Sequence, residues 1–401
     1  MSILSAGIRF FVVITIILIV SSCVNSEPGS YLYKSIDNNW VIQSSDSVSS
    51  SGQRISTPGF KTSGWYAAKV PETVLHSLVR NGFFSDIFKD NNLEQISSAP
   101  FKSSWWYRTE FDIKRMPEAA LLHFEGINYK ANIYLNGEQI ADTSTVKNAF
   151  RQFHFEIFDK IRKGKNVLAI EVFPPVKGDF SIGFVDWNPA PPDNNMGLFR
   201  RVILETNGGV GISKPFVVSE LNDDLSEAAL TASVELTNFT DDELDGEVIL
   251  SVNGHKISKK TGLKANETKR ILFSAGEFKQ LLIKNPELWW PKTLGEPHLY
   301  NAGFEFRSSG VTIDKKSIRF GIRTVSDFFT KEGHRGFRIN GKKILIRGGG
   351  WVDRLLLDDT RESIQNQLEY VNDMGLNTIR LEGFWGKTRP FMTFVMRWVF
   401  W

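Results

Sequence analysis

Alternation of apolar and polar residues dominates the first half of the chain and predicts β-strands. Residues 105–113, 120–140 and 165–175 alternate over runs of strand length, and Asn136-Gly137 is a strong hairpin signal. Residues 71–82 instead predict a short helix that ends at a glycine. Many short strands separated by turn signals predict a jelly-roll-type β-sandwich over residues 40–206.

A second β-rich segment covers residues 207–326. Five alternating stretches between residues 229 and 325 have the spacing of an immunoglobulin-like β-sandwich. The chain has one cysteine, Cys23, which lies far outside this segment. The predicted sandwich therefore lacks the internal disulfide of antibody domains.

The pattern changes after residue 327. Residues 337–351 predict a hairpin that leads into a nearly continuous apolar strand, and residues 376–384 predict another strand. Between them, residues 358–375 have the period of an amphipathic helix. A strand, a helix and a strand in this order predict a parallel sheet, which is the start of a (β/α)8 TIM barrel over residues 327–387. The fold class predicted for the whole chain is mostly β.

Composition and charge narrow the function classes. The net charge is +3 with acids and bases mixed along the chain, so nothing predicts a nucleic-acid surface. The six histidines lack metal-ligand spacing, and Gly348-Gly349-Gly350 lacks the Gly-Lys-Ser/Thr of a phosphate loop. We expect neither a metal nor a cofactor. The 31 Phe and 11 Trp fit either a β-sheet core or sugar-stacking platforms.

The N-terminus predicts an export signal and a lipid anchor. Arg9 precedes an apolar run that is too short for a comfortable membrane span, and Cys23 follows it directly. The residues before Cys23 resemble a bacterial lipobox, so we expect a signal peptide at 1–22, lipidation of Cys23 and a tether at 23–39. We therefore expect a lipid-anchored protein of the bacterial cell envelope, in the periplasm or at the outer membrane. An ordinary signal peptide with a chance cysteine is the alternative.

Four stretches in this order resemble glycoside hydrolase family 2. "FEGINYKANIYLNG" resembles its N-terminal sugar-binding domain, and "FVDWNPAPPDNNMGLFR" resembles the segment by which that domain reaches the active site. "NPELWWPKTLGEPHLY" resembles its immunoglobulin-like domain, and "IRGGGW" with "MGLNTIRLEG" resembles the first two barrel strands. "DNNMG" and "RLEG" are most similar to the exo-β-glucosaminidase branch, with β-mannosidases and β-galactosidases as alternatives.

The resemblance implies a retaining, exo-acting glycosidase on a β-linked amino-sugar or mannoside oligosaccharide, such as a chitosan oligosaccharide. Its two catalytic carboxyl groups, about 5–5.5 Å apart, come from later barrel strands beyond residue 401. No catalytic residue is therefore expected in this chain, which alone is expected to be inactive. From another functional class, the chain fits a non-catalytic, membrane-anchored carbohydrate-binding protein.

Three candidate substrate-binding residues lie at the ends of the two barrel strands. The resemblance makes Arg380 the arginine that keeps the catalytic carboxylates ionised. Glu382 would pair with the ammonium group of a glucosamine unit, and Trp351 would form a wall of the sugar subsite. The alternatives are a structural ion pair between Arg380 and Glu382 and a core indole at Trp351.

Four further candidates lie between residues 186 and 194. The resemblance sends Asp186 and Trp187 into the pocket, where Asp186 would bind sugar hydroxyls. Asp193 and Asn194 are second contacts. The alternative for Asp186 is an Asx turn before Pro189.

The last fourteen residues, 388–401, depart from the family pattern. "TRPFMTFVMRWVFW" has no caps and no helical period. Reading compatible codons with one added G gives Asp-Gln-Thr-Leu-Tyr-Asp-Leu-Cys-Asp-Glu-Met-Gly-Ile-Leu, which is a plausible barrel helix. We therefore interpret this tail as out-of-frame translation caused by one nucleotide missing after the Lys387 codon. We also expect the residues after Asp327 to fold poorly.

Overall fold

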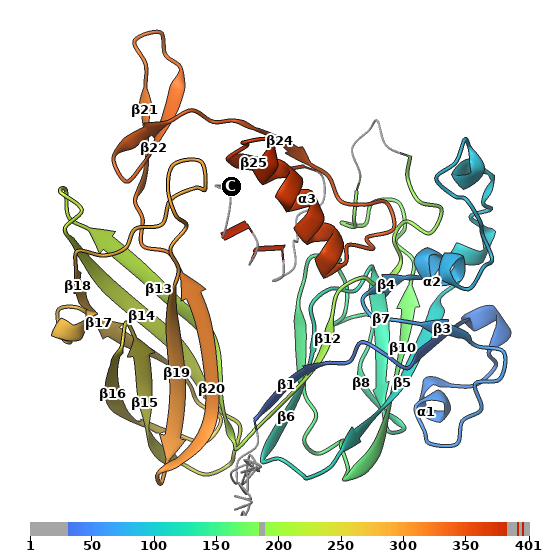
Figure 1. The fold of residues 1–401 in the computed structure, drawn as a ribbon. Helices are drawn as coiled ribbons and strands as arrows, with labels where there is room; N and C mark the ends of the chain where they lie inside the picture. Colours follow the sequence, from blue (N-terminus) through green and yellow to red (C-terminus); the bar gives the residue numbers. More distant parts are fainter. Residues whose placement is uncertain (1–30, 184–188, 383–390, 393–394, 397–401) are drawn as a thin grey trace, which may run out of the picture.

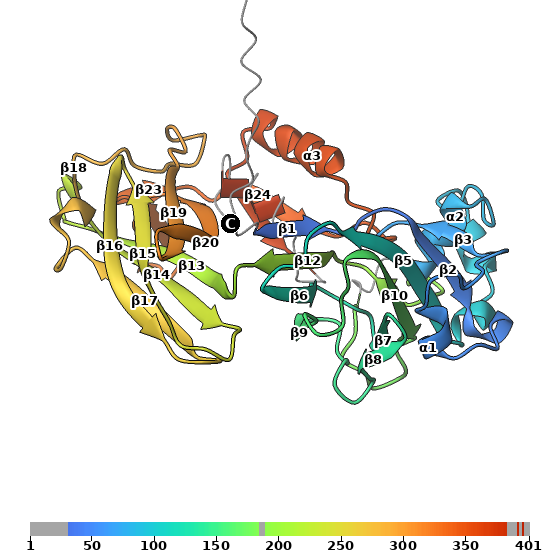
Figure 2. The ribbon, with the colours of Figure 1, turned by 90° about the horizontal axis from the view of Figure 1, so that it is seen from below.

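The computed structural model describes residues 31–183, 189–382, 391–392 and 395–396. Two β-sandwiches stand side by side, and a smaller unit containing α3 and β24 lies above the gap between them (Figure 1). Figure 2 shows the same arrangement from below. The fold is mostly β, as the sequence predicts. Within the described ranges, no helix has the length and apolar character needed to cross a membrane.

The first sandwich consists of two antiparallel sheets. The smaller sheet has the order β1 (Leu32–Ser35), β12 (Val202–Asn207), β6 (Ala119–Phe124) and β9 (Phe153–Glu156). The larger has the order β3 (Tyr66–Ala68), β2 (Trp40–Ser44), β5 (Trp105–Ile113), β10 (Gly164–Phe173), β7 (Lys130–Leu135) and β8 (Glu138–Ala141). A short pair joins β4 (Glu72–Thr73) to β11 (Gly197–Leu198). The helical segments are α1 (Gly52–Ile55), α2 (Val74–Arg80), η1 (Ser45–Ser47), η2 (Asn92–Gln95) and η3 (Ala99–Phe101).

The predicted hairpin of this sandwich is confirmed. Asn136 and Gly137 both have positive φ, 53° and 95°, and they connect β7 to β8. Positive φ at both positions gives a turn whose twist matches that of the paired strands. The apolar residues of these strands close a core that completely buries Trp40, Tyr107 and Phe124.

The second sandwich packs two further antiparallel sheets around its own core. One sheet contains β13 (Val210–Leu221), β14 (Glu227–Asn238), β17 (Thr268–Ser274) and β18 (Leu282–Lys284), with β14 paired to all three others. The other has the order β16 (His255–Leu263), β15 (Leu244–Val252), β19 (Tyr300–Ser308) and β20 (Val311–Phe320), and η4 (Lys279–Leu281) lies between β17 and β18. Phe273, Phe304 and Phe306 lie at the centre of its core.

The third unit begins with an antiparallel sheet that protrudes from the molecule (Figure 1). This sheet is formed by β21 (Val325–Phe329), β22 (Arg335–Ile339) and β23 (Lys342–Ile344). The chain then forms β24 (Gly348–Trp351), α3 (Arg361–Asp373) and β25 (Thr378–Leu381), and β24 pairs with β25 in parallel. The predicted start of a TIM barrel is confirmed as a strand, a helix and a parallel strand.

The helix α3 has the apolar face that the sequence predicts. The Thr360 hydroxyl accepts a hydrogen bond from the backbone N–H of Ser363 at 3.0 Å and caps its first turn. Ile364 and Leu368 are buried against the two strands. Because these residues are four positions apart, they lie on one side of the helix.

The final segment differs in part from its prediction. Its four described residues are helical, and Phe391 and Val395 are buried in the same cluster as Ile364 and Leu368. The interpretation of residues 388–401 as an out-of-frame tail stays a prediction. Phe391 and Val395 are spaced by one helical turn, so their side chains can share one face.

Candidate active site

The adjacent C-terminal ends of β24 and β25 form the candidate active site. Trp351 lies opposite Leu381, and the backbone N–H of Glu382 donates to the carbonyl oxygen of Trp351 at 2.9 Å. In TIM barrels, substrates bind at the C-terminal ends of the strands. The parallel register therefore places Glu382 at the functional edge of this sheet.

Glu382 is held over the backbone of Gly350. A Cβ added to Gly350 would lie 2.2 Å from Oε1 of Glu382, a distance that real Cβ contacts do not reach. A side chain at residue 350 would therefore displace the carboxylate from its present position. The Glu382 side chain is 22% exposed, so the carboxylate is largely sheltered but can still be reached from solvent.

Arg380 contacts Glu382 from the same strand. The Arg380 guanidinium donates to the Glu382 carboxylate, while the Arg380 side chain remains 77% exposed. The structure thus shows the ion pair between Arg380 and Glu382, which was the alternative to their roles in substrate binding. The pair also keeps a positive group beside the sheltered carboxylate.

Trp351 lies in the core of the third unit. The indole is only 8% exposed and packs edge-on against the Phe391 ring, with the ring centroids 5.1 Å apart. Its neighbours include Leu368 of α3. In this chain the indole therefore takes the core position that was the alternative. Because Phe391 belongs to the tail that we interpret as out of frame, the role of Trp351 as a subsite wall stays a prediction.

Asp193 has a structural role that the sequence did not indicate. Its carboxylate accepts hydrogen bonds from the backbone N–H groups of Leu75, at 2.8 Å, and Asn195, at 2.9 Å. The residue is 1% exposed, and burial raises the pKa of Asp193 to about 6, an effect that these hydrogen bonds only partly offset. The prediction of a sugar contact at Asp193 is corrected, because its carboxylate is enclosed and already bonded.

The other candidates in this segment have different outcomes. Asn194 is exposed, and its backbone carbonyl accepts a hydrogen bond from the Asn128 side chain at 2.8 Å. Asp186 and Trp187 lie outside the described residues, as does the predicted lipidation site Cys23. Their roles remain predictions.

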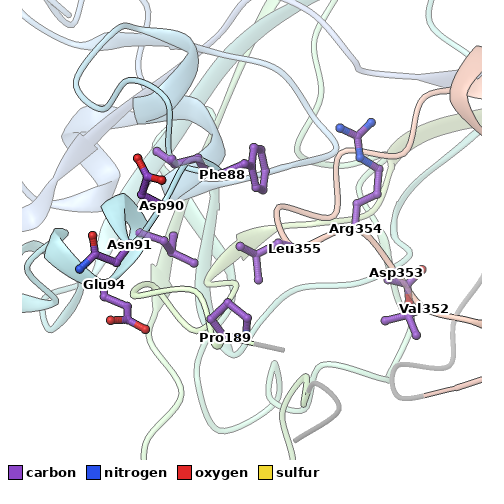
Figure 3. A pocket seen from close by; sticks show the side chains of 11 residues that line it. Phe88, Asp90, Asn91, Glu94, Pro189, Val352, Asp353, Arg354 and Leu355 are labelled. Carbon is purple, nitrogen blue, oxygen red and sulfur yellow. The ribbon is translucent and has the colours of Figure 1, made fainter. Parts of the chain in front are cut away.

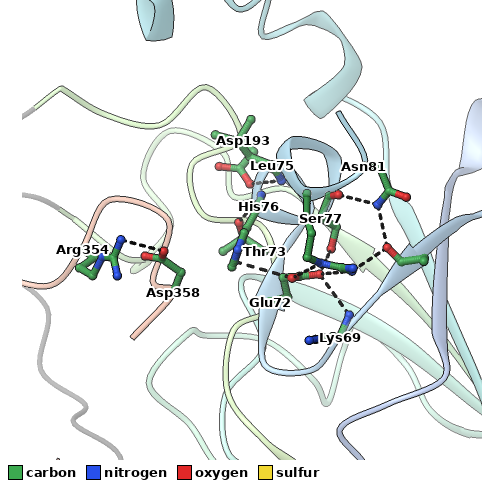
Figure 4. Close-up of polar contacts among 12 residues, drawn as sticks. Lys69, Glu72, Thr73, Leu75, His76, Ser77, Asn81, Asp193, Arg354 and Asp358 are labelled. Carbon is green, nitrogen blue, oxygen red and sulfur yellow. Dashed lines mark hydrogen bonds and ion pairs between the residues drawn. The ribbon is translucent and has the colours of Figure 1, made fainter. Parts of the chain in front are cut away.

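A buried polar network holds α2 next to this segment (Figure 4). The Glu72 carboxylate, 2% exposed, accepts hydrogen bonds from Arg80 Nε at 2.9 Å and from the backbone N–H of Lys69 at 3.1 Å. Burial by itself raises the pKa of Glu72, but the bonds from Arg80, Ser77 and Lys69 outweigh burial and leave the pKa below its ordinary value. The network therefore ties Lys69, before the helix, and Arg80, its last residue, to the same carboxylate.

The loop after β24 packs onto the first sandwich. Leu355 and Leu356 are buried in the core of that sandwich, although they belong to the third unit. Arg354 in the same loop pairs with Asp358 at 3.1 Å (Figure 4). Burial lowers the pKa of His76, which lies near Asp358, and the carboxylates of Glu72 and Asp358 only partly oppose that shift. The buried side chains of Leu355 and Leu356 thus anchor the loop to the first sandwich, and charged and polar groups lie next to this apolar contact.

A cavity of about 570 Å³ lies beside this loop (Figure 3). Its lining includes Asp353 and Arg354 from the third unit and Phe88 from the first sandwich. None of these three residues is among the predicted site residues. The position of Asp353 and Arg354 just after a barrel strand is a sequence signal for substrate-binding residues. No local pattern marks Phe88. Over the described ranges, no group of three or more His, Cys, Asp or Glu side chains is arranged to hold a metal ion.

Comparison with known protein families supports this architecture. Residues 40–182 match the glycosyl hydrolase 2 galactose-binding domain-like model, and residues 210–323 match the glycosyl hydrolases family 2 model. These segments correspond to the two sandwiches and together make up more than half of the chain. The family resemblance inferred from motifs is therefore confirmed.

The similar proteins include exo-β-D-glucosaminidases. The chain is 34% identical to the enzyme of Amycolatopsis orientalis over 345 residues, which cover 86% of this chain and 33% of that enzyme. It is 28% identical to the mannosylglycoprotein endo-β-mannosidase of Lilium longiflorum, over 88% of this chain and 41% of that protein. The chain thus spans less than half the length of these relatives.

Solved structures give the same result. The structure of the Amycolatopsis orientalis exo-chitosanase superposes with a TM-score of 0.85 at 32% identity, covering 91% of this chain and 42% of that protein. A β-D-mannosidase from Dictyoglomus thermophilum, at 22% identity and a TM-score of 0.71, shares the fold. Because both sandwiches and the first barrel strands agree in order and structure, this chain belongs to glycoside hydrolase family 2, whose members are glycosidases.

Proposed function

We propose that the protein to which this chain belongs is an exo-acting β-D-glucosaminidase that removes glucosamine units from β-linked oligosaccharides such as those of chitosan. The observation that carries the proposal is the sheltered Glu382 carboxylate at the end of β25, held over Gly350. The similarity to exo-β-D-glucosaminidases at 34% and 33% identity supports it.

Glu382 provides the chemical basis for choosing an amino sugar. A glucosamine unit carries an ammonium group, and a hydrogen bond between an ammonium group and a carboxylate is stronger than one between neutral groups. Arg380 already offers one positive charge to this carboxylate, and an ammonium group would add a second, whereas a neutral hexose offers only hydroxyl donors. Glu382 therefore favours an amino sugar such as glucosamine over a neutral sugar such as mannose.

The expected reaction is hydrolysis with retention of configuration. In such enzymes one carboxyl group protonates the leaving oxygen and a second attacks the anomeric carbon, about 5–5.5 Å away. We assign neither role to a residue of this chain. Glu382 would bind and orient the sugar, and Arg380 would supply positive charge beside it.

The test begins with the DNA around codon 387. If the frame restored by one nucleotide continues into barrel strands, the protein expressed from it should hydrolyse a β-linked glucosamine disaccharide and should leave mannobiose intact. Glu382→Gln should lower kcat/KM for the glucosamine substrate by about 10- to 100-fold, because a hydrogen bond to a charged group is removed. Equal activity on both disaccharides would contradict the assignment, and incompatible codons would refute the frameshift.

We also propose that Cys23 carries a lipid that attaches the protein to the bacterial envelope. The support is the apolar run that ends just before this single cysteine. Expression in a bacterial host should place the wild-type chain in the membrane fraction, and Cys23→Ser should release it from that fraction. A wild-type chain found only in the periplasmic extract would contradict the anchor.

A further inference from the structure

The cavity beside the loop after β24 is shared by two units of the molecule. Phe88, Asp90 and Glu94, from the loop that follows α2, form one side (Figure 3). Asp353 and Arg354, from the loop that follows β24, form the other side. Its volume of about 570 Å³ lies within the roughly 300–1,000 Å³ that is typical of small-molecule sites.

One side of the cavity is formed by the chain that continues directly from β24 of the candidate active site. Val352 and the next three residues line it, and they directly follow Trp351, the last residue of β24. The C-terminal ends of barrel strands are where substrates bind. Since Leu355 and Leu356 are buried in the first sandwich, the loop that forms this side is anchored rather than free to move away.

The lining combines apolar and aromatic surface. Pro189 and Leu355 lie between the two polar sides (Figure 3). The Phe88 side chain is 65% exposed, so its ring can be reached from solvent. An exposed aromatic ring beside a cavity offers a flat surface on which the apolar face of a sugar ring can pack.

The charge of the cavity is negative. Asp90, Glu94 and Asp353 contribute three carboxylates to the lining. Arg354 is the basic residue among those that line the cavity. Its guanidinium already pairs with the carboxylate of Asp358, a residue that does not line the cavity. A cavity with this excess of negative charge attracts cations and repels anions.

We propose that this cavity is a subsite for a further glucosamine unit of the same chain, beyond the unit that is bound at Glu382. The sugar ring packs on Phe88, and its ammonium group pairs with Asp90 and Glu94. This inference rests on the proposed function and extends it from one sugar to a cationic oligosaccharide. It also gives the first sandwich a direct part in binding the substrate.

The test is a binding titration of the 401-residue chain with a β-1,4-linked glucosamine tetramer and with cellotetraose, its neutral analogue. At about pH 5.5 both the amino groups and ordinary carboxyl groups are charged. The wild-type chain should bind the glucosamine tetramer at least about fivefold more tightly, and added salt should reduce this preference. The double variant Asp90→Asn/Glu94→Gln should lose it.

The variants are matched to their controls. Asp90 has a positive φ of 50°, which asparagine tolerates, so Asp90→Asn should fold normally. Asp241→Asn/Glu243→Gln removes two exposed carboxylates from the second sandwich and should leave both affinities unchanged. Phe88→Ala should weaken binding of both tetramers by several-fold, because the ring contact does not depend on the ammonium group.

Each outcome decides the proposal. Loss of preference in the Asp90/Glu94 double variant alone supports the subsite. Equal binding of both tetramers to the wild-type chain, no binding up to about 10 mM, or an unchanged preference in the double variant overturns it. The proposed function is judged separately by disaccharide hydrolysis, so a failure of catalysis and a failure of this subsite give different results.

Discussion

At the scale of single residues, the candidate site depends on a glycine as much as on a carboxylate. Gly350 and Glu382 lie on neighbouring strands, and the Glu382 carboxylate occupies the space that a Cβ at residue 350 would need. At Gly349, the preceding residue, no heavy atom lies within 4 Å of the position that a Cβ would take. The two glycines therefore form a natural pair for a test.

We expect Gly350→Ala to weaken glucosamine binding by about tenfold or more, because it displaces a carboxylate that makes a charge-assisted hydrogen bond. Gly349→Ala should change binding by less than about twofold, since its methyl group meets open space. Titration of both variants with glucosamine measures the effect. Similar affinities in the two variants would show that Glu382 does not bind the sugar from its present position.

At the scale of elements, α2 connects the first sandwich to the cavity. Its first turn is capped by the Thr73 hydroxyl, which accepts from the backbone N–H of His76 at 3.1 Å. The distant Asp193 carboxylate binds the N–H of Leu75 in the same turn. The loop that carries Phe88 begins soon after this helix ends, so the anchoring of α2 affects where that loop lies.

The raised pKa of Asp193 makes a prediction about stability. Its folded-state pKa of about 6 exceeds the ordinary 3.8, so the folded chain holds more protons between about pH 4 and pH 6. The contribution of Asp193 to the free energy of unfolding should therefore fall by about 2–3 kcal/mol as the pH rises through this window. Asp193→Asn does not titrate and should lack this decline.

The measurement is urea unfolding of the wild type and of Asp193→Asn at several pH values from about 4 to 7. It gives the difference in the free energy of unfolding between the two proteins at each pH. Asp142→Asn is the matched control. Hydrogen bonds from Ser144 lower the pKa of Asp142, so its contribution should rise with pH instead. A difference between wild type and Asp193→Asn that stays constant with pH would contradict the predicted burial effect.

At the scale of the whole molecule, two closed sandwiches support a thinner third unit. The sandwiches are joined by Glu205 on β12, which pairs with Lys316 on β20 at 2.7 Å. The third unit has a much smaller buried cluster, and a cavity of about 260 Å³ separates part of α3 from its sheet. Leu345 and Tyr370 are 76% and 70% exposed. We still expect this unit to be the least stable part.

Limited trypsin digestion tests that expectation. The exposed sites Lys331, Arg335 and Lys343 in the protruding sheet should be cut before the exposed Lys256 and Lys260, which lie on β16 of the second sandwich. Cleavage requires local opening, which costs less where few apolar contacts hold the chain. Mass spectrometry should first detect a fragment with both sandwiches. Earlier cleavage at Lys256 or Lys260 would contradict the ranking.

The sequence by itself determined the type and order of the elements. Alternation with period two marked the strands of both sandwiches, the Asn136-Gly137 pair marked a hairpin, and period 3.6 marked α3. These signals are local, because each depends on neighbours a few residues apart. Family motifs then added the expected position of Glu382 at the end of a barrel strand.

Only the tertiary structure decided how these residues are used. In a linear sequence, Trp351 and Asp193 are equally compatible with a binding site and a core. In the structure they contact Phe391 and Leu75, which lie far away along the chain. The cavity likewise joins loops more than 250 residues apart, around Phe88 and Asp353. Burial and cavities arise from long-range packing, which no local pattern encodes.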